Sequence, residues 1–299
     1  MNRRLAGWCI YLVILCGAFA LPLREFVTFA RHSEVHSYVL LIPFVTAYLI
    51  YIRWKQLSRE LSTAWGNALL FALAGTAALS ASLYFTELGQ NDYMTLIALS
   101  FVCFVIAGVF LFLGSKWAHS AMFPLFFLAF MIPLPEAVVD SLENASKEAS
   151  AEIANWLFLI SGTPALRMGT VFQLPGISIM VAKECSGIRS SLVLVITSLL
   201  AANMFLRTTW RRALLVGAVI PLGLLRNGFR ILVISLLCVH IGPEMIDSPI
   251  HRRGGPIFFV ASLIPLFVVL WWLRRGEVAA QQRRTSENPK SIPADVPIA

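Results

Sequence analysis

The chain has 299 residues, of which 58% are hydrophobic and only 13% are charged. A soluble domain carries about 25% charged residues, so this composition excludes an ordinary water-soluble globular protein and indicates a chain whose surface faces lipid. The formal net charge is +8, but the Lys and Arg residues lie in short segments between apolar runs, a pattern that favours membrane orientation over a nucleic-acid partner.

Eight apolar runs are long enough, or nearly so, to cross the hydrocarbon layer, which takes about 20 helical residues. They fall at 5–23, 38–54, 67–86, 93–113, 117–134, 187–206, 213–238 and 256–273. The first run has no clean cleavage site and many runs follow it, so we interpret it as a retained span and not as a signal peptide. The sequence therefore predicts an all-α integral membrane protein, a bundle of about eight transmembrane helices.

The basic residues predict how this bundle is oriented. If the N-terminus is cytoplasmic, the inside segments hold Arg3, Arg4, Arg53, Lys55, Arg59, Lys116, Arg207, Arg211, Arg212, Arg274 and Arg275. Short loops rich in Lys and Arg stay on the cytoplasmic side, and an even number of spans places both termini there. The longest loop, from about 135 to 186, then lies outside.

The sequence of the outer loop predicts an amphipathic helix followed by a short β-hairpin. Apolar residues recur at steps of three and four, which predicts a helix on the membrane surface or packed against the bundle. These residues are Val138, Leu142, Ala145, Ala149, Ile153, Trp156, Leu157 and Ile160. Apolar, β-branched stretches then flank the turn signal Pro175-Gly176, which predicts a hairpin that returns the chain to the membrane at Cys185.

The end of the chain differs in composition from the rest. After Gly276 it is polar and contains Pro, Ser and Gln, which is typical of disorder. We therefore expect a polytopic transmembrane domain over residues 1–275 and a disordered cytoplasmic tail over 276–299.

The five cysteines do not indicate a disulfide framework or a metal site. Cys9, Cys16, Cys103 and Cys238 lie in strongly apolar segments, where cysteine acts as a small hydrophobic side chain. The count is odd and no CxxC pair occurs, so we expect no metal and no cofactor. Cys185 differs, because it lies in a polar stretch where the outer loop re-enters the membrane.

Three features could carry chemistry, and the polar stretch Lys183-Glu-Cys-Ser-Gly-Ile-Arg189 is the first. It places a thiol among charged and hydroxyl groups at the membrane boundary. The alternative interpretation is a plain helix start, with Ser186 as the N-cap and Gly187 allowing close packing.

The second feature is a pair of arginines, Arg226 and Arg230, within the seventh apolar run. An intramembrane arginine is costly and indicates a functional site by default. The two residues are four apart, so they share one face in the outer half of the helix. The alternatives are snorkelling to the outer interface and an ion pair with Glu184 or Asp247.

The third feature is His251, in the segment before the last apolar run. The alternative interpretation is an ordinary solvated histidine, and His240 is a nearby rival. His32 and His36 are also four residues apart and could suit a metal on a helix, but without an HExxH arrangement that pattern is a weak signal.

The predicted topology brings Cys185, Arg226, Arg230 and His251 together at the outer boundary of the membrane. A thiolate is a nucleophile whose pKa falls beside a cation. An imidazole can protonate a leaving amine, and a guanidinium can hold a developing oxyanion in a water-poor site. These residue types together predict an acyl-transfer site.

The segments that carry these residues resemble the exosortase/archaeosortase family of membrane transpeptidases. That family has a Cys-Ser-Gly-aliphatic-Arg box, an Asn-x-x-Arg box and a downstream His followed shortly by Gly; the matching segments here are ECSGIRSS, NGFRI and the His251 segment. HSYVLLIPFVTAYLIYIRW is similar to the family's early second span, and FMIPLPEAV together with LPGISIMVAKECSGIR is similar to its outer loop. The resemblance covers roughly residues 30–273.

The resemblance implies roles for individual residues. Cys185 matches the family's nucleophile, Arg230 the arginine of its Asn-x-x-Arg box, and His251 its catalytic histidine. Arg226 has no clear counterpart in that box and is a supporting candidate. The other supporting or substrate-binding candidates are Asn227, Ser186, Gly187, Arg189 and Glu184. Glu184 departs from the family pattern, which often has a small residue there, and its carboxylate should oppose thiolate formation unless a neighbouring cation neutralises it.

The resemblance also implies a substrate and a location. Exosortases are thought to process exported proteins whose C-terminal signal has a short motif such as Pro-Glu-Pro, one transmembrane helix and a basic cytoplasmic end. We therefore expect a cysteine protease or transpeptidase of the bacterial cytoplasmic membrane, with its active site outside the cytoplasm. Two alternatives remain open: a transporter or channel that binds an anion at Arg226 and Arg230, and a scaffold without catalysis.

Overall fold

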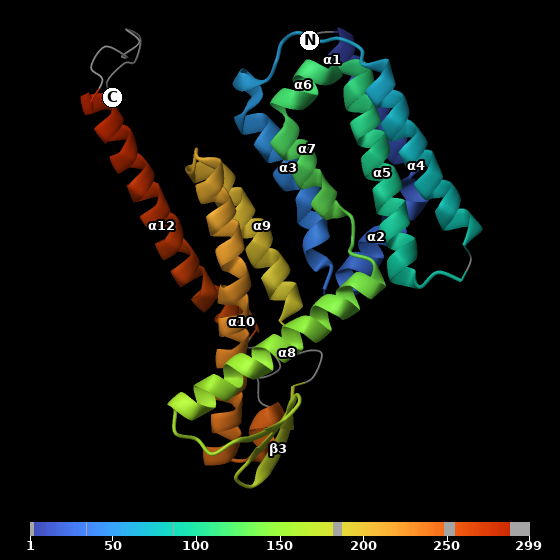
Figure 1. Cartoon of the computed structure of the whole chain (residues 1–299). Coiled ribbons are helices and arrows are strands. Elements are labelled where there is room, and N and C mark those ends of the chain that lie inside the picture. The colour runs from blue at the N-terminus through green and yellow to red at the C-terminus, as the bar shows by residue number, and fades with distance from the viewer. Residues whose placement is uncertain (1–2, 34, 86, 182–186, 248–254, 288–299) are drawn as a thin grey trace. The chain divides into compact units, whose positions relative to one another are not determined.

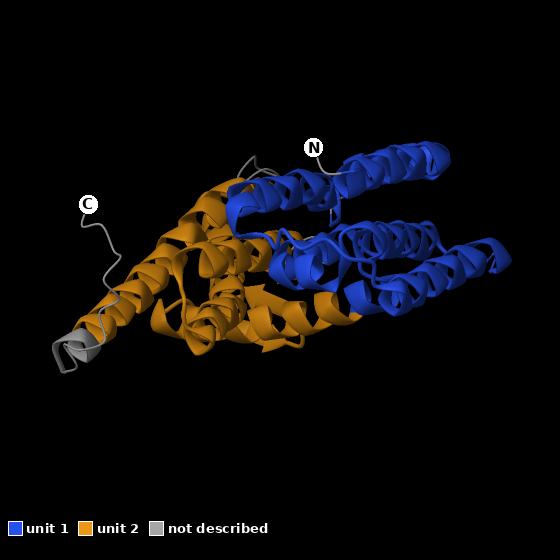
Figure 2. Cartoon of the chain, turned by 90° about the horizontal axis from the view of Figure 1, so that it is seen from above, with its two compact units in different colours: residues 1–140 blue, residues 141–299 orange. Residues whose placement is uncertain are grey.

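The structure, a computed structural model, describes residues 3–33, 35–85, 87–181, 187–247 and 255–287 (Figure 1). By contacts between residues the chain divides into two compact units, Met1–Asp140 and Ser141–Ala299 (Figure 2). Each unit is described by itself below.

All regular elements in the described residues of the first unit are helices or 3-10 turns. Its elements are α1 (Arg3–Ala18), α2 (Ala20–His32), the 3-10 turn η1 (Ser37–Leu41), α3 (Ile42–Ile52), η2 (Trp54–Gln56), α4 (Trp65–Tyr84), α5 (Gln90–Phe112), α6 (Gly114–Ser120), α7 (Met122–Leu128) and η3 (Ala129–Met131). Helix α5 is the most buried of them and packs against α4 and α1. Gly75 lets α4 approach closely, because a Cβ there would lie 3.2 Å from the carbonyl oxygen of Ser100.

The second unit contains four long helices and a small sheet among its described residues. Its elements are α8 (Glu136–Ile160, which begins shortly before the unit boundary), β1 (Leu166–Met168), β2 (Val171–Leu174), β3 (Ile177–Met180), α9 (Ile188–Phe205), α10 (Thr209–His240), η5 (Pro243–Asp247) and α12 (Gly255–Glu287). Helices α9, α10 and α12 share one apolar core, which includes Leu194, Leu215 and Leu266 (Figure 1).

The helices confirm an all-α membrane protein. Among the described residues, five helices are long and apolar enough to span a membrane: α4, α5, α9, α10 and α12. The number rises to seven if two bent pairs each count as one span, α1 with α2 at 72° and Met122–Met131 with α8 at 89°. The sequence predicts about eight spans; the run at 38–54 instead forms a shorter apolar helix, Ser37–Ile52.

The predicted β-hairpin is present and has one additional strand. The strands form an antiparallel sheet in the order β1-β2-β3, with Phe172 paired to Ile179, and Gly176 turns between β2 and β3 at φ +80°. Phe172 packs against Phe158 of α8, in a core that also contains Ile231 and Leu232 of α10. The sheet is therefore anchored to the second half of α10.

Helix α8 confirms the predicted helix, but its packed face differs from the predicted apolar face. Its buried residues are Ser150, Ala151, Ala154 and Phe158. Val138, Leu142, Trp156 and Ile160 of the predicted face are between 42% and 79% exposed. Small side chains allow α10 and the sheet to approach closely, and this arrangement leaves the larger apolar side chains facing outward, where lipid can cover them.

Helix α12 extends beyond the predicted end of the transmembrane domain. It continues to Glu287, although the sequence predicts disorder from residue 276. No Pro or Gly follows Gly276 within this helix, and its last turns are rich in Ala, Gln, Glu and Arg, which favour helix. Residues 288–299 lie outside the described part of the chain.

Candidate active site at the start of α9 and the middle of α10

Four of the predicted site residues, Glu184, Cys185, Ser186 and His251, lie outside the described residues. Their meeting in one pocket therefore stays a prediction. The structure describes the chain on both sides of the Cys185 segment, the start of α12 after the His251 segment, and the arginine pair of α10.

The chain before Cys185 is held by the sheet. Val181 directly follows β3, its side chain is 3% exposed, and it belongs to the core formed by α8, the sheet and α10. Its backbone N–H donates to the carbonyl oxygen of Thr170 at 2.9 Å. The main chain is therefore fixed up to residue 181.

The chain after Cys185 is fixed at Gly187, which caps α9. Gly187 has φ +68°, a conformation that favours glycine. A Cβ there would lie 2.9 Å from Nη2 of Arg226 and 3.0 Å from Oδ1 of Asn227. The close-packing role considered for Gly187 is present, and the N-cap of the helix is Gly187 itself.

Arg226 reaches from α10 to this cap. Its Nη2 donates to the carbonyl oxygen of Gly187 at 3.1 Å and to Oγ of Ser191 at 3.3 Å. The same carbonyl also accepts from the backbone N–H of Ser191 and the hydroxyl of Ser190, both at 3.0 Å. Arg226 is only 9% exposed, so it does not snorkel to the membrane surface.

The charge of Arg226 is not balanced by any described carboxylate. Among the described side chains it forms no salt bridge, and its Nη1 is buried without a hydrogen-bond partner. A buried guanidinium with an unused donor is costly, which favours a role in binding a negative group. Its predicted ion-pair partners, Glu184 and the side chain of Asp247, are not described.

Asn227 and Gly228 tie the same turn of α10 to α8. Asn227 is 2% exposed, and its Nδ2 donates to Oγ of Ser150 at 3.0 Å. A Cβ at Gly228 would lie 2.6 Å from Cγ2 of Ile153 and 3.2 Å from the backbone nitrogen of Ala154. Three consecutive residues of α10 therefore fix its position against both α9 and α8.

Arg230 lies one turn beyond Arg226 and is partly exposed. Its neighbour Phe229 faces outward and packs edge-on against Phe258 of α12, with ring centroids 6.5 Å apart. The first turns of α12, which follow the His251 segment, thus lie beside the Arg230 turn of α10. The structure brings Gly187, Arg226 and Asn227 together, whereas Arg189 is exposed on the first turn of α9.

Two residues of this network, Ser150 and Ser191, are not among the sequence-predicted candidates. Ser191 is the last residue of the ECSGIRSS segment and lies four residues after Gly187. Four residues are about one helical turn, so the sequence could have indicated that Ser191 lies on the same face as Gly187. Nothing in the sequence distinguishes Ser150 from the other small residues of α8. No group of three or more His, Cys, Asp or Glu side chains that could hold a metal occurs among the described residues.

The comparisons with known proteins identify the family of the chain. The family model described as transmembrane exosortase matches residues 30–268, a range that includes the Cys185 segment, the arginine pair and His251. Neither the curated proteins nor the solved structures give a match. Since the family model covers well over half of the chain, this multi-pass membrane protein belongs to the transmembrane exosortase family.

Proposed function

We propose that this protein is a membrane cysteine transpeptidase or protease that cleaves C-terminal sorting signals of exported proteins through an acyl-enzyme on Cys185. The observation that carries the proposal is the hydrogen bond from buried Arg226 to Gly187, two residues after the predicted nucleophile. The family assignment supports the same chemistry.

The hydrogen bond from Arg226 to Gly187 supports a thiolate at Cys185, because it brings a cation close to that residue. Two residues span at most about 7 Å, so the covalent chain keeps Cys185 close to the carbonyl that Arg226 binds. A nearby cation favours the ionised thiol. Nη1 of Arg226 has no hydrogen-bond partner among the described residues, and we propose that it donates to that thiolate.

The contact between α10 and α12 supports a role for His251. Gly255 begins α12 four residues after His251, a distance of at most about 14 Å along the chain. The Phe229–Phe258 contact holds this helix start against the residue that precedes Arg230. An imidazole on the preceding segment is therefore within reach of the same region.

The proposed reaction has two steps. The Cys185 thiolate adds to the carbonyl carbon of the scissile peptide, and Arg230 stabilises the oxyanion. His251 gives its proton to the leaving amine as the carbon–nitrogen bond breaks, which leaves a thioester on Cys185. An acceptor amine or water then attacks the thioester and restores the thiol. Transfer and hydrolysis differ only in this acceptor.

The proposed substrate is an exported protein with a short C-terminal motif, one transmembrane helix and a basic end. A substrate helix held by its basic end in the cytoplasm would present its motif at the outer face, where the sequence predicts Cys185. This orientation, in the bacterial cytoplasmic membrane with both termini inside, is part of the proposal.

The experiment that tests the proposal co-expresses the protein with a tailed substrate and follows processing by the change in substrate mass. Cys185→Ala should abolish processing, and Arg230→Gln and His251→Ala should each reduce it strongly. Cys9→Ala is the matched control, because Cys9 is an exposed thiol on α1. Unchanged processing by the Cys185→Ala variant would exclude the thiol mechanism.

A further inference from the structure

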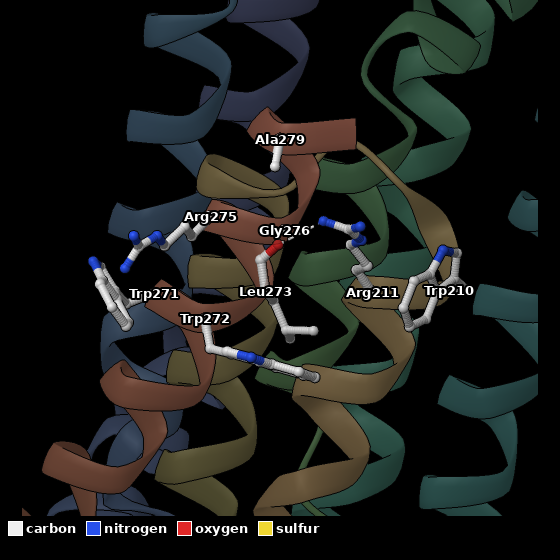
Figure 3. A pocket seen from close by; sticks show the side chains of 8 residues that line it. All are labelled: Trp210, Arg211, Trp271, Trp272, Leu273, Arg275, Gly276 and Ala279. Atoms are coloured by element: carbon white, nitrogen blue, oxygen red, sulfur yellow. Dashed lines mark hydrogen bonds between the residues drawn. The ribbon is translucent and has the colours of Figure 1, made fainter. Parts of the chain in front are cut away.

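A hollow of about 420 Å³ lies where the start of α10 meets α12 (Figure 3). It is lined by Trp210, Arg211, Trp271, Trp272, Leu273, Arg275, Gly276 and Ala279. Arg211 and Arg226 are separated by about 22 Å along the helix, at about 1.5 Å per residue. The hollow is therefore separate from the site proposed for catalysis.

The walls of this hollow are held in place by hydrogen bonds between α12 and the α9–α10 turn. The carboxylate of Glu277 accepts from the backbone N–H of Arg207 at 3.0 Å and of Thr208 at 2.7 Å, and also from the Thr208 hydroxyl. Nη1 of Arg211 donates to the carbonyl oxygen of Leu273 at 2.6 Å. The site is thus preformed by the protein.

Guanidinium groups lie on opposite sides of the hollow, each stacked on tryptophan. Arg211 lies 5.2 Å from the centroid of the Trp210 ring, and Arg275 lies 5.3 Å from that of Trp271 (Figure 3). Nε of Arg211 is buried without a hydrogen-bond partner among the described residues. No acidic residue lines the hollow, and Glu277 is engaged with the backbone of the α9–α10 turn.

A second hollow of about 460 Å³ adjoins the first around α12 and shares Trp271, Arg275 and Ala279 with it. It adds Arg274, whose guanidinium lies 5.7 Å from the centroid of the Phe205 ring. Three guanidinium groups and several exposed aromatic rings thus surround one short stretch of α12.

We propose that this surface binds an anionic phospholipid, with the phosphate held by the arginines that line it and the glycerol and upper acyl chains against the tryptophans. Arginine binds phosphate oxygens through its paired donors, and tryptophan settles at the level of lipid headgroups. Free phosphate would leave the apolar walls unused. The basic end of a sorting signal would be repelled by the same arginines.

The charge pattern assigns this site to the inner leaflet. Arg207, Arg211 and Arg212 meet Arg274 and Arg275 at one end of the second unit, and clustered arginines of this kind remain cytoplasmic. Basic pockets between helices on that side suit anionic headgroups.

The test measures lipid binding by the full-length protein in neutral detergent, using native mass spectrometry with phosphatidylglycerol and phosphatidylcholine. We expect retention of phosphatidylglycerol over phosphatidylcholine and a loss of affinity of about fivefold for each arginine replaced by glutamine. Arg275→Gln is the primary variant, since Arg211→Gln also removes the bond to Leu273. Arg59→Gln, on an exposed loop of the first unit, is the control.

Two further measurements test whether the bound anion is a lipid or free phosphate, and whether the arginines are needed for binding. Millimolar inorganic phosphate should not displace the lipid, and displacement would assign the site to free phosphate and overturn the proposal. Equal retention of both lipids, or unchanged retention by Arg275→Gln and by the Arg211→Gln/Arg275→Gln double variant, would also overturn it. Thermal unfolding in lipid-free detergent identifies a variant that has lost its fold.

Discussion

The guanidinium of Arg226 donates a 3.1 Å hydrogen bond to the carbonyl oxygen of Gly187, across 39 positions of sequence. This bond joins the middle of α10 to the cap of α9, and it places a buried cation beside the segment that carries Cys185. The family resemblance gives Arg226 no clear role, whereas in the structure this charged side chain is buried, with 9% of it exposed.

Replacing Arg226 should impair both the position and the ionisation of the proposed nucleophile. We expect Arg226→Gln to lower processing by about 10²-fold, because small displacements of reacting groups have effects of that size. It should also raise the pKa of the Cys185 thiol, because the cation that favours the thiolate is gone. The pH dependence of Cys185 alkylation measures this shift, with the other cysteines replaced.

Arg226→Lys separates charge from hydrogen-bond geometry. It should retain the pH profile of Cys185 alkylation but lose part of the activity, since an ammonium cannot reproduce the planar fork. If alkylation follows the same pH profile in Arg226→Gln as in the unchanged protein, Arg226 has a structural role alone.

Gly187→Ala should destabilise the site through the backbone and through contact. The positive φ costs a non-glycine residue about 1–2 kcal/mol, and the added methyl would press on Arg226 and Asn227. We expect a lower unfolding temperature in detergent together with loss of processing. Gly217→Ala is the matched control, because a Cβ there meets nothing within 4 Å, and in a helix alanine should be neutral or stabilising.

Asn227 and Ser150 should be energetically coupled. Their 3.0 Å hydrogen bond is buried, and such a bond contributes about 1 kcal/mol. In a double-mutant cycle, Asn227→Ala and Ser150→Ala should each destabilise, and together by less than their sum. Additive effects on the free energy of unfolding would mean that the two side chains do not interact.

The buried imidazole of His36 should make the stability of the first unit depend on pH. The residue is 4% exposed and stacks on Phe29 at 5.8 Å, and burial lowers the pKa of its imidazole below 6.5. The unfolded chain then binds a proton more readily than the folded one, so stability should fall as pH drops below about 6.5. The unfolding temperature in detergent between pH 8 and pH 5 measures this effect.

His36→Phe should reduce that pH dependence, because the aromatic contact remains while the titrating group is removed. His119→Phe is the control, since His119 is exposed on α6. A slope that is the same in the His36 variant and in the unchanged protein would assign the effect to other groups.

Parts of this architecture follow directly from apolar periodicity. The runs at 187–206 and 213–238 correspond to α9 and α10, which cover Ile188–Phe205 and Thr209–His240. Strand β1 was not predicted, because three residues are too few to show an alternating pattern. The sequence predicts that the apolar face of α8 lies on the membrane or against the bundle; in the structure alanine and serine make the close contacts, while larger apolar residues face outward.

The site was predictable in its residues but not in its contacts. Arg226, Asn227 and Gly187 stand out because a charge, an amide and a glycine are unusual in apolar segments. Which of them touch depends on the rotation of α9 against α10 and α8, which local patterns do not determine. The bond between Asn227 and Ser150 joins residues 77 positions apart, and only the folded chain reveals it.

In the proposed mechanism, the hydrogen bonds that hold α10 and the α9–α10 turn affect how a substrate helix could reach the thiol. Arg226 joins the middle of α10 to the α9 cap, and Glu277 joins the α9–α10 turn to α12. Parting α9 from α10 to form a lateral gate would break buried hydrogen bonds of Arg226. For the proposed substrate helix, the seam between α9 and α10 is therefore a costly route to Cys185.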